Sequence, residues 1–447
     1  MGQLCATTNG NGNTTSYHYD AVGNLATVTP PAPLGATTIV VDSLGRPVTV
    51  TDGKGQVTRT TYDTNDQVTQ VLTAGATTCT YAAGTCVTTT YDPAGDVASR
   101  TDVTGTTVFS YDNLDRQSGK LLPSGSNLTL GYDAVGNVTS YADGGGIVAY
   151  GFDPANELTS LVEPGGATTT FGYNNNAVRT STTYPGGTVL TDTLDNSSRT
   201  TEMKATHGYT VLSDLVYSYT NGTNDTTLES IRSDEVAGAI TMNSYDALNR
   251  LTQATETVGG TTTASWLYCY DNDGNRVATS TTPGATCAFP MTTYGYNGAD
   301  QLTARNGDTA GWSYDANGNE IAALGATTRT NEHYSSTNQL TGLSSNNAPT
   351  GFSYAGLSNS ERIQSGSTSF ENGEDGLANQ TVGSAKTNFT RDPSGMLISE
   401  RLGGQSYYYI LDDLGSVVGL VNASGTKVNS YSYDPYGQAR IVTEQVS

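Results

Sequence analysis

Tyr132-Asp133-Ala134-Val135-Gly136-Asn137 is the stretch that decides the fold, because the same phrase returns along the whole chain. Its pattern is an aromatic residue, an aspartate, two variable positions, a glycine and an asparagine. Strict copies begin at Tyr19, Tyr270 and Tyr314, and looser copies begin at Tyr62, Tyr91, Tyr111, Phe152, Tyr173, Tyr245, Tyr296 and Tyr433. The starts at 91, 111, 132, 152 and 173 are 20 or 21 residues apart. A fixed period of this size predicts stacked supersecondary units rather than one globular core.

The phrase combines the end of one strand, a turn and the start of the next strand. Each period has room for two strands of about six to eight residues and two turns. The aspartate can accept a hydrogen bond from the backbone N–H two residues on. Glycine supplies the positive φ that a tight hairpin turn needs, and asparagine tolerates the same region better than most residues. We therefore expect an all-β fold of repeated antiparallel hairpins.

The repeated residues have an architectural role in this interpretation, not a catalytic one. Acid–base catalysis needs two carboxylates in different environments that face one substrate, whereas these aspartates recur in the same local setting. The residues of the strict copies and of the C-terminal copy are Tyr19, Asp20, Gly23, Asn24, Tyr132, Asp133, Gly136, Asn137, Tyr270, Asp271, Gly274, Asn275, Tyr314, Asp315, Gly318, Asn319, Tyr433, Asp434 and Gly437.

Composition supports the all-β prediction. Charged residues make up 14% of the 447 residues, and tyrosine reaches 28. Threonine and tyrosine favour strands, while glycine and asparagine belong to turns. The best short helix candidate surrounds residues 234–237 and soon meets Gly238.

The charge balance argues against a nucleic-acid partner. Lysine and arginine number 20 against 42 acidic residues, which gives a net charge of −22 and a pI near 4.3. A chain this acidic repels phosphate backbones. The sequence contains no run of about 18 apolar residues, so we expect no membrane span. The N-terminus lacks the features of a signal peptide, so we expect that upstream sequence directs export or that this chain is an internal piece of a longer protein.

Five cysteines form two local pairs and one remainder. Cys79 and Cys86 flank a loop that a disulfide could close, and Cys269 and Cys287 bracket the turn at 271–274. Cys5 has no local partner. Two local disulfides would suit an oxidising, extracytoplasmic setting. The alternative is that the cysteines stay reduced in strands.

No constellation of catalytic or cofactor-binding residues is evident. The three histidines, His18, His207 and His333, are scattered without metal-ligand spacing. Glycine-rich tracts such as 144–146 lack the lysine and the following helix of a phosphate loop. We therefore expect no enzyme activity, no cofactor and no metal.

Calcium is the strongest metal candidate in the sequence. Two turns share the alternation that opens an EF-hand loop: Asp271, Asp273 and Asn275 in one, and Asp315, Asn317 and Asn319 in the other. That loop also needs a glutamate at position 12, where this chain has Thr282 and Ala326. The missing glutamates argue against calcium binding.

The phrase and its period resemble the YD repeats of the RHS family, which includes the C components of Tc insecticidal toxins, bacterial wall-associated proteins and animal teneurins. The resemblance assigns residues 1–404 to the repeat region, with degenerate units around 185–240 and 340–390. It implies a long β-sheet wound as a spiral that forms part of a hollow shell.

The C-terminal stretch extends the resemblance. Residues 409–421 and the copy at 433–438 look like the start of the RHS repeat-associated core segment, which we place at 405–447 in truncated form. In the family this segment runs on to an Arg-Tyr-Tyr-Asp-Pro stretch, and in many toxins to aspartates that release a C-terminal toxin. The chain reaches Ser447 before those residues, so we expect neither self-cleavage nor toxin activity from it.

Two functions of different classes follow from the resemblance. The first is a non-enzymatic shell wall that encapsulates or presents a toxin or effector cargo in a secreted polymorphic-toxin system. The second is a secreted or cell-surface module in which exposed tyrosines, Trp266 and Trp312 bind carbohydrate or a partner cell. Packing within the sheet is the plainer interpretation of both tryptophans.

Overall fold

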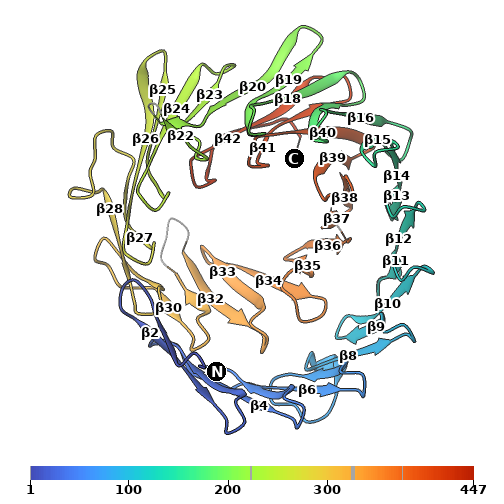
Figure 1. The fold of residues 1–447 in the computed structure, drawn as a ribbon, viewed down its shortest axis with the longest axis vertical. Coiled ribbons are helices and arrows are strands. Elements are labelled where there is room, and N and C mark those ends of the chain that lie inside the picture. Colours follow the sequence, from blue (N-terminus) through green and yellow to red (C-terminus); the bar gives the residue numbers. More distant parts are fainter. Residues whose placement is uncertain (1, 222–223, 324–327, 375, 447) are drawn as a thin grey trace. The chain divides into compact units, whose positions relative to one another are not determined.

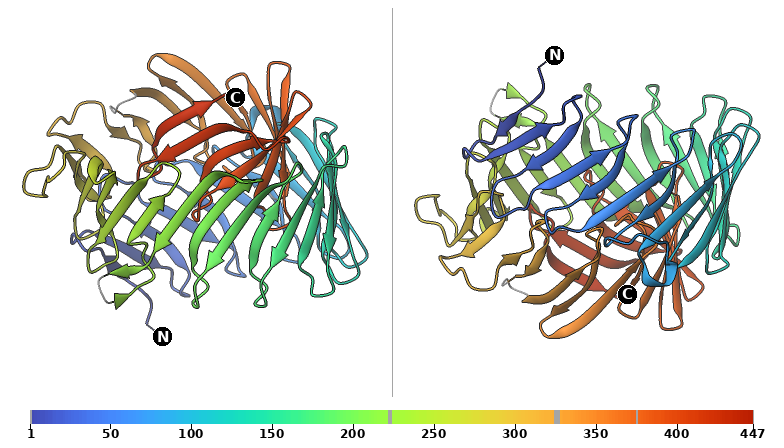
Figure 2. Two further views of the ribbon diagram at one scale, coloured as in Figure 1. Left: turned by 90° about the horizontal axis from the view of Figure 1, so that it is seen from above. Right: turned by 90° about the horizontal axis from the view of Figure 1, so that it is seen from below.

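The computed structural model describes residues 2–221, 224–323, 328–374 and 376–446, and nearly all of its regular structure is antiparallel β-strand. Most consecutive strands pair with each other in antiparallel hairpins (Figure 1 and Figure 2). The exceptions include β20, which pairs with β23, while β21–β22 and β30–β31 form small sheets of their own. In the described ranges the helical structure is a single short 3-10 turn, η1 (Tyr81–Ala83). The all-β prediction is confirmed.

The chain divides into two compact units, and each is built from segments that are distant in sequence. Unit 1 holds residues 1–127, 270–278 and 292–372. Its strands are β1 (Ala6–Thr8), β2 (Thr14–Tyr19), β3 (Leu25–Thr29), β4 (Thr37–Val41), β5 (Pro47–Thr51), β6 (Val57–Tyr62), β7 (Val68–Leu72), β8 (Cys86–Tyr91), β9 (Val97–Asp102), β10 (Gly105–Tyr111), β11 (Gln117–Leu121), most of β27 (Arg276–Ser280), β28 (Thr292–Tyr296), β29 (Leu302–Arg305), β30 (Ser313–Tyr314), β31 (Glu320–Ala322), β32 (Arg329–Tyr334), β33 (Leu340–Ser345), β34 (Ala348–Tyr354), β35 (Arg362–Ser365) and β36 (Thr368–Asn372).

Unit 2 holds residues 128–269, 279–291 and 373–447. Its strands are β12 (Asn127–Tyr132), β13 (Val138–Asp143), β14 (Gly146–Phe152), β15 (Leu158–Val162), β16 (Thr168–Tyr173), β17 (Arg179–Thr183), β18 (Thr188–Leu194), β19 (Thr200–His207), β20 (Thr210–Ser218), β21 (Thr220–Asn221), β22 (Asn224–Asp225), β23 (Ile231–Asp234), β24 (Ala239–Tyr245), β25 (Leu251–Val258), β26 (Thr261–Tyr270), β37 (Leu377–Val382), β38 (Ala385–Arg391), β39 (Leu397–Leu402), β40 (Gln405–Leu411), β41 (Val417–Asn422), β42 (Lys427–Tyr433) and β43 (Ala439–Glu444).

Unit 2 has an apolar core between two layers of strands. Leu161 on β15 is fully buried against a cluster that includes Ile398, Tyr408 and Val421 from β39, β40 and β41. Figure 1 shows the C-terminal strands beside β15–β20. Burial of an apolar side chain contributes about 1.5–3 kcal/mol, so this core holds the two layers together. The hairpins of this unit therefore bury apolar surface against strands that are distant in sequence as well as against their neighbours.

Contacts between distant segments of unit 1 include many polar groups of its turns. The backbone N–H of Gly356 donates to Asp102 Oδ2 at 2.7 Å. Lys54 Nζ lies 2.9 Å from Asp315 Oδ2, and Asn11 Nδ2 donates to Asp271 Oδ2 at 3.0 Å. Side chains of the turns therefore also bind groups from segments that are distant in sequence.

The segments with degenerate repeats also form regular hairpins. The strands β19 and β20 pair from Glu202 and Val216 to the turn at 208–209, and β33 to β38 fill most of 340–390. The helix candidate at 234–237 is the end of β23 and the turn that leads to β24. Antiparallel strand pairing thus continues through the segments in which the sequence repeat is degenerate.

Candidate functional site

Each repeat aromatic residue occupies the same place in its hairpin. All the strict and looser copies put the tyrosine or phenylalanine at the last residue of a strand, from Tyr19 on β2 to Tyr433 on β42. The pairing register shifts at this residue, as between Gly131 and Tyr132. The aromatic residue thus marks a bulge just before the turn.

The aspartate that follows is the hydrogen-bond acceptor of the turn. Asp133 Oδ1 accepts the backbone N–H groups of Val135, Gly136 and Asn137 at 2.8–3.0 Å. The backbone N–H of Asp133 donates to the carbonyl oxygen of Asn137 at 3.0 Å. Gly136 has a φ of 105°, a conformation that glycine adopts readily. One carboxylate therefore satisfies the donors of a five-residue connection.

The last residue of the phrase has a role that the sequence analysis missed. Asn137 is absent from the residues with positive φ; instead its Nδ2 donates to Asp133 Oδ2 at 2.8 Å. Looser copies place arginine at this position, as in the copy at Tyr111, where Arg116 Nε donates to Asp112 Oδ2 at 2.7 Å. The turn at 42–46, which lacks the aromatic residue, has the same contact, with Arg46 Nε 2.7 Å from Asp42 Oδ2. The shared property is a donor that reaches back to the aspartate, and the alternation of asparagine and arginine could have suggested it.

These donors lower the pKa of turn carboxylates. The side-chain hydrogen bond from Arg46 is the main cause that lowers the pKa of Asp42 below its usual value. The side-chain hydrogen bond from Asn24 does the same to the pKa of Asp20. A carboxylate with a lowered pKa is a stable acceptor and a poor general acid, which supports the architectural interpretation.

The tyrosine hydroxyls connect neighbouring hairpins. Tyr19 donates to the carbonyl oxygen of Leu4 at 3.0 Å, and Tyr62 donates to that of Pro47 at 3.0 Å. The same contact recurs at the C-terminal copy, where Tyr433 donates to the Val417 carbonyl at 2.7 Å. Each bond reaches the preceding part of the sheet and so joins one repeat to the next.

Side chains also connect one turn to the next. Asn137 Nδ2 donates to Asn156 Oδ1 at 3.0 Å in unit 2. In unit 1, Asn275 Nδ2 donates to Asp300 Oδ1 at 2.8 Å, and Arg46 Nη1 lies 2.6 Å from Asp66 Oδ1. The residue that reaches back to its own aspartate thus also reaches forward to the following turn.

The turns considered for calcium are occupied by protein donors. The Asp315 carboxylate accepts Asn319 Nδ2 and Lys54 Nζ, and a lysine beside it opposes a bound cation. Asp271 accepts Asn275 and Asn11. Across the residues that the structure describes, no group of three or more His, Cys, Asp or Glu side chains could hold a metal ion; Ala326 lies outside those residues.

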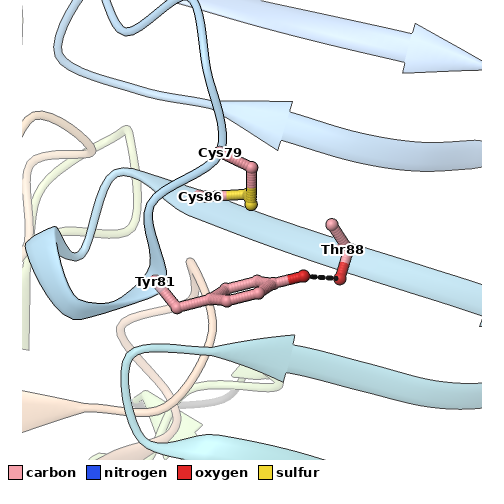
Figure 3. The surroundings of a disulfide bond; sticks show 4 residues. All are labelled: Cys79, Tyr81, Cys86 and Thr88. Carbon is pink, nitrogen blue, oxygen red and sulfur yellow. Dashed lines mark hydrogen bonds between the residues drawn. A yellow bond between two sulfur atoms is a disulfide. The ribbon is translucent and has the colours of Figure 1, made fainter.

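Both local cysteine pairs are joined in the structure. Cys79 is bonded to Cys86 with a Cα–Cα distance of 5.1 Å, and Cys269 is bonded to Cys287 with a Cα–Cα distance of 5.8 Å. Cys5 is a free, exposed thiol. Figure 3 shows that the side chain of Tyr81, in the loop between Cys79 and Cys86, reaches Thr88 on β8, and its hydroxyl lies 2.8 Å from Thr88 Oγ1.

The two tryptophans differ in their surroundings. Trp266 on β26 is only 8% exposed, and the guanidinium of Arg440 lies 4.8 Å from its ring centroid. Trp312 is half-buried. The Trp266 ring is therefore already covered by this chain. Among the described residues, no helix is both long and apolar enough to cross a membrane.

Comparisons with known proteins agree with the repeat geometry. The model of the family described as RHS Repeat matches residues 2–33, 41–78 and 132–168. A search of curated protein sequences finds no match. Solved structures give strong matches over 99% of the chain: TcdB2-TccC3 at a TM-score of 0.75 and 14% identity, and TcdB2-TccC3-Cdc42 at 0.74 and 13%. The Photorhabdus luminescens Tc holotoxin pore with a TccC3 mutation matches at 0.73 and 14%.

The structural matches cover this chain almost completely but cover only part of the solved chains. This chain spans 27–28% of their length. At this level of identity the likeness establishes the fold, which is the repetitive antiparallel sheet described above. The chain therefore matches the RHS Repeat model at residues 2–33, 41–78 and 132–168, and it shares the repetitive β-sheet fold of these Tc toxin structures.

Proposed function

We propose that this chain is a non-enzymatic structural scaffold, a wall segment of an RHS/YD-repeat shell. The shell encapsulates or presents a toxin or effector cargo in a secreted polymorphic-toxin system. The observation that carries the proposal is the fold shared over 99% of the chain with Tc toxin structures. The repeated turns support it, because their carboxylates are used as acceptors of backbone and side-chain donors.

Secretion fits the cysteine chemistry. The two disulfides at 79–86 and 269–287 belong to an oxidising compartment. The net charge of −22 favours solubility over contact with nucleic acid. The proposed partner is a polypeptide cargo encoded in the same or a neighbouring reading frame.

Limited proteolysis tests the scaffold function. The complete gene product that contains residues 1–447 is digested with a broad-specificity protease, and the surviving peptides are identified by mass spectrometry. We expect a polypeptide outside residues 1–447 to survive as long as the sheet is folded and to be degraded once urea unfolds the sheet. Degradation of every such polypeptide at the same rate with the sheet folded or unfolded would contradict encapsulation.

A further inference from the structure

A ligand-sized cavity lies in unit 2 between four consecutive strands and two C-terminal turns. Its volume is about 380 Å³, within the ~300–1,000 Å³ of small-molecule sites. One wall comes from the segment before β23, which carries Glu229, and from β23 to β26. The other comes from the turns that follow β40 and β42 and from β43, which carries Arg440. The lining includes Glu229, Arg232, Glu256, Asp412, Asp413 and Arg440.

The charged groups of the cavity do not balance. Arg440 is fully engaged by Glu256, with Nη1 at 2.7 Å from Oε2 and Nη2 at 3.1 Å from Oε1. Arg232 Nη2 lies 3.4 Å from the buried Asp412 carboxylate. Asp434 Oδ1 accepts two backbone N–H groups of its own turn. Two carboxylates are left, Glu229 and Asp413, and in the described part of the chain neither has a cation within ion-pair distance.

Glu229 is held in place although, among the described residues, no cation lies within ion-pair distance of it; the charge of Arg232 acts on it from farther away and lowers its pKa. Asn243 Nδ2 donates to its Oε1 at 3.1 Å, and the Tyr245 hydroxyl donates to its backbone carbonyl at 2.7 Å. Burial, and next the charge of Asp413, raise the pKa of Glu229 to about 7. Burial, and next the charge of Asp412, raise the pKa of Asp413. Two carboxylates thus face one cavity at an electrostatic cost that a cation would remove.

Aromatic rings at the cavity already bind guanidinium groups of this chain. Arg440 lies over Trp266 at 4.8 Å, and Arg199 lies over Tyr219 at 4.8 Å. A cation over an aromatic ring gains about 0.5–2 kcal/mol. Those two ring faces are thus occupied by Arg440 and Arg199, and the cavity offers a further basic side chain enough volume and two carboxylates without an ion-pair partner.

We propose that this cavity binds the guanidinium of an arginine side chain from another polypeptide segment, between Glu229 and Asp413. The planar guanidinium suits carboxylates on two sides and aromatic walls better than a compact ammonium does. The site goes beyond the scaffold function, because binding of a side chain is a separate property of the residues that line the cavity. Binding competes with protonation of Glu229, so affinity falls as the pH drops below about 7.

Calorimetric titration of the full chain tests the site. The probe is N-acetyl-argininamide, and the matched neutral probe is N-acetyl-glutaminamide. We expect binding of the arginine probe at pH 8, a roughly tenfold loss of affinity at pH 5.5 and no binding of the neutral probe. Equal affinity at both pH values would overturn the proposal, as would a lack of heat at millimolar probe.

Variants locate the binding in the cavity. Glu229→Gln and Asp413→Asn should each weaken binding of the arginine probe by roughly tenfold, because each removes one charge contact. Glu235→Gln removes the same charge from an exposed turn of unit 2 and should leave the affinity unchanged. Circular dichroism checks that each variant is folded. If one cavity variant does not fold, the other still tests the site. Unchanged affinity for the arginine probe in a folded cavity variant would overturn the proposal.

Discussion

At the residue scale, the repeat aspartate works by supplying an acceptor that a hairpin turn lacks. In the copy that starts at Tyr91, Asp92 Oδ1 accepts the N–H groups of Ala94, Gly95 and Asp96 at 2.9–3.0 Å. The contribution of the turn aspartate to folding stability differs from turn to turn, because the exposure and the further partners of the carboxylate differ. Asp20 is exposed and meets only its own turn, whereas Asp392 is 2% exposed and also accepts Arg179 Nη1 at 2.8 Å from β17.

Asp392→Ala should destabilise the protein strongly. The substitution removes the acceptor for the Ser394 and Met396 N–H groups and leaves Arg179 without its buried partner. Breaking a buried ion pair costs about 3–5 kcal/mol. The free energy of unfolding, from urea denaturation, measures the loss. Asp20→Ala is the matched control on an exposed turn and should cost clearly less; equal losses would show that the cross-layer ion pair contributes nothing.

Glu229 gives the protein a pH dependence opposite to that of the turn aspartates. Its folded pKa of about 7 lies above the ordinary value of 4.5. Between those values the folded state keeps a proton that the unfolded state has lost, so stability falls as the pH rises through this window. The full change is at most about 3 kcal/mol.

Glu229→Gln should remove this loss, since glutamine does not titrate. Urea denaturation of wild type and variant at pH 5 and pH 8 measures it. From pH 5 to pH 8, the free energy of unfolding should fall less in the variant than in wild type. Every other titrating group is the same in both proteins, so the difference reports Glu229. An identical pH dependence in both proteins would contradict the role of Glu229.

The local part of the repeat could be read from the sequence, but the cavity could not. Tyrosine, aspartate and glycine act within six residues, so their spacing predicts the turn. Asn137 was misjudged because a side chain that tolerates positive φ and a side chain that donates to an aspartate look alike in one sequence. Glu229 and Asp413 are separated by 184 positions (413 − 229), and neither belongs to a motif that would connect them.

At the element scale, the hairpin is the structural unit, and three kinds of contact join one hairpin to the next. These are the backbone ladder, the tyrosine hydroxyl to a carbonyl such as that of Pro47, and the side-chain contact between turns such as Asn275 to Asp300. The period predicted the ladder. The hydroxyl contacts were not predicted, because their acceptors are backbone atoms that carry no sequence signal.

Loss of the disulfides should weaken two hairpins by unequal amounts. The Cys79–Cys86 bond closes a loop with a sequence separation of 7, and the Cys269–Cys287 bond closes one of 18. Loop-closure entropy predicts losses of about 2 and about 3 kcal/mol, respectively. Urea denaturation of Cys79→Ser/Cys86→Ser and Cys269→Ser/Cys287→Ser measures both. Alkylation of the non-reduced protein is the control and should label Cys5 alone; labelling of all five cysteines would contradict both bonds.

At the scale of the whole molecule, stability does not follow from the repeat alone. A sequence period describes neighbours along the chain, so it predicts a stack in which each hairpin depends on the next. Unit 2 departs from that description, because Leu161 packs with Ile398 and Val421 from strands more than 200 positions later. Alternating threonine and apolar residues could be recognised in the sequence, but the pairing of apolar faces between distant strands could not.

Leu161→Ala should therefore destabilise both segments of unit 2 together. The side chain is fully buried between the layers, and such truncations cost about 2–5 kcal/mol. Hydrogen exchange followed by mass spectrometry should show faster exchange in β15 and equally in β39 and β41. Ile147→Ala on β14, where the side chain is 63% exposed, is the matched control and should change neither segment. Faster exchange confined to β14–β16 would contradict a core shared between distant strands. In a stack without a shared core, the loss of stability reaches only the adjacent hairpins.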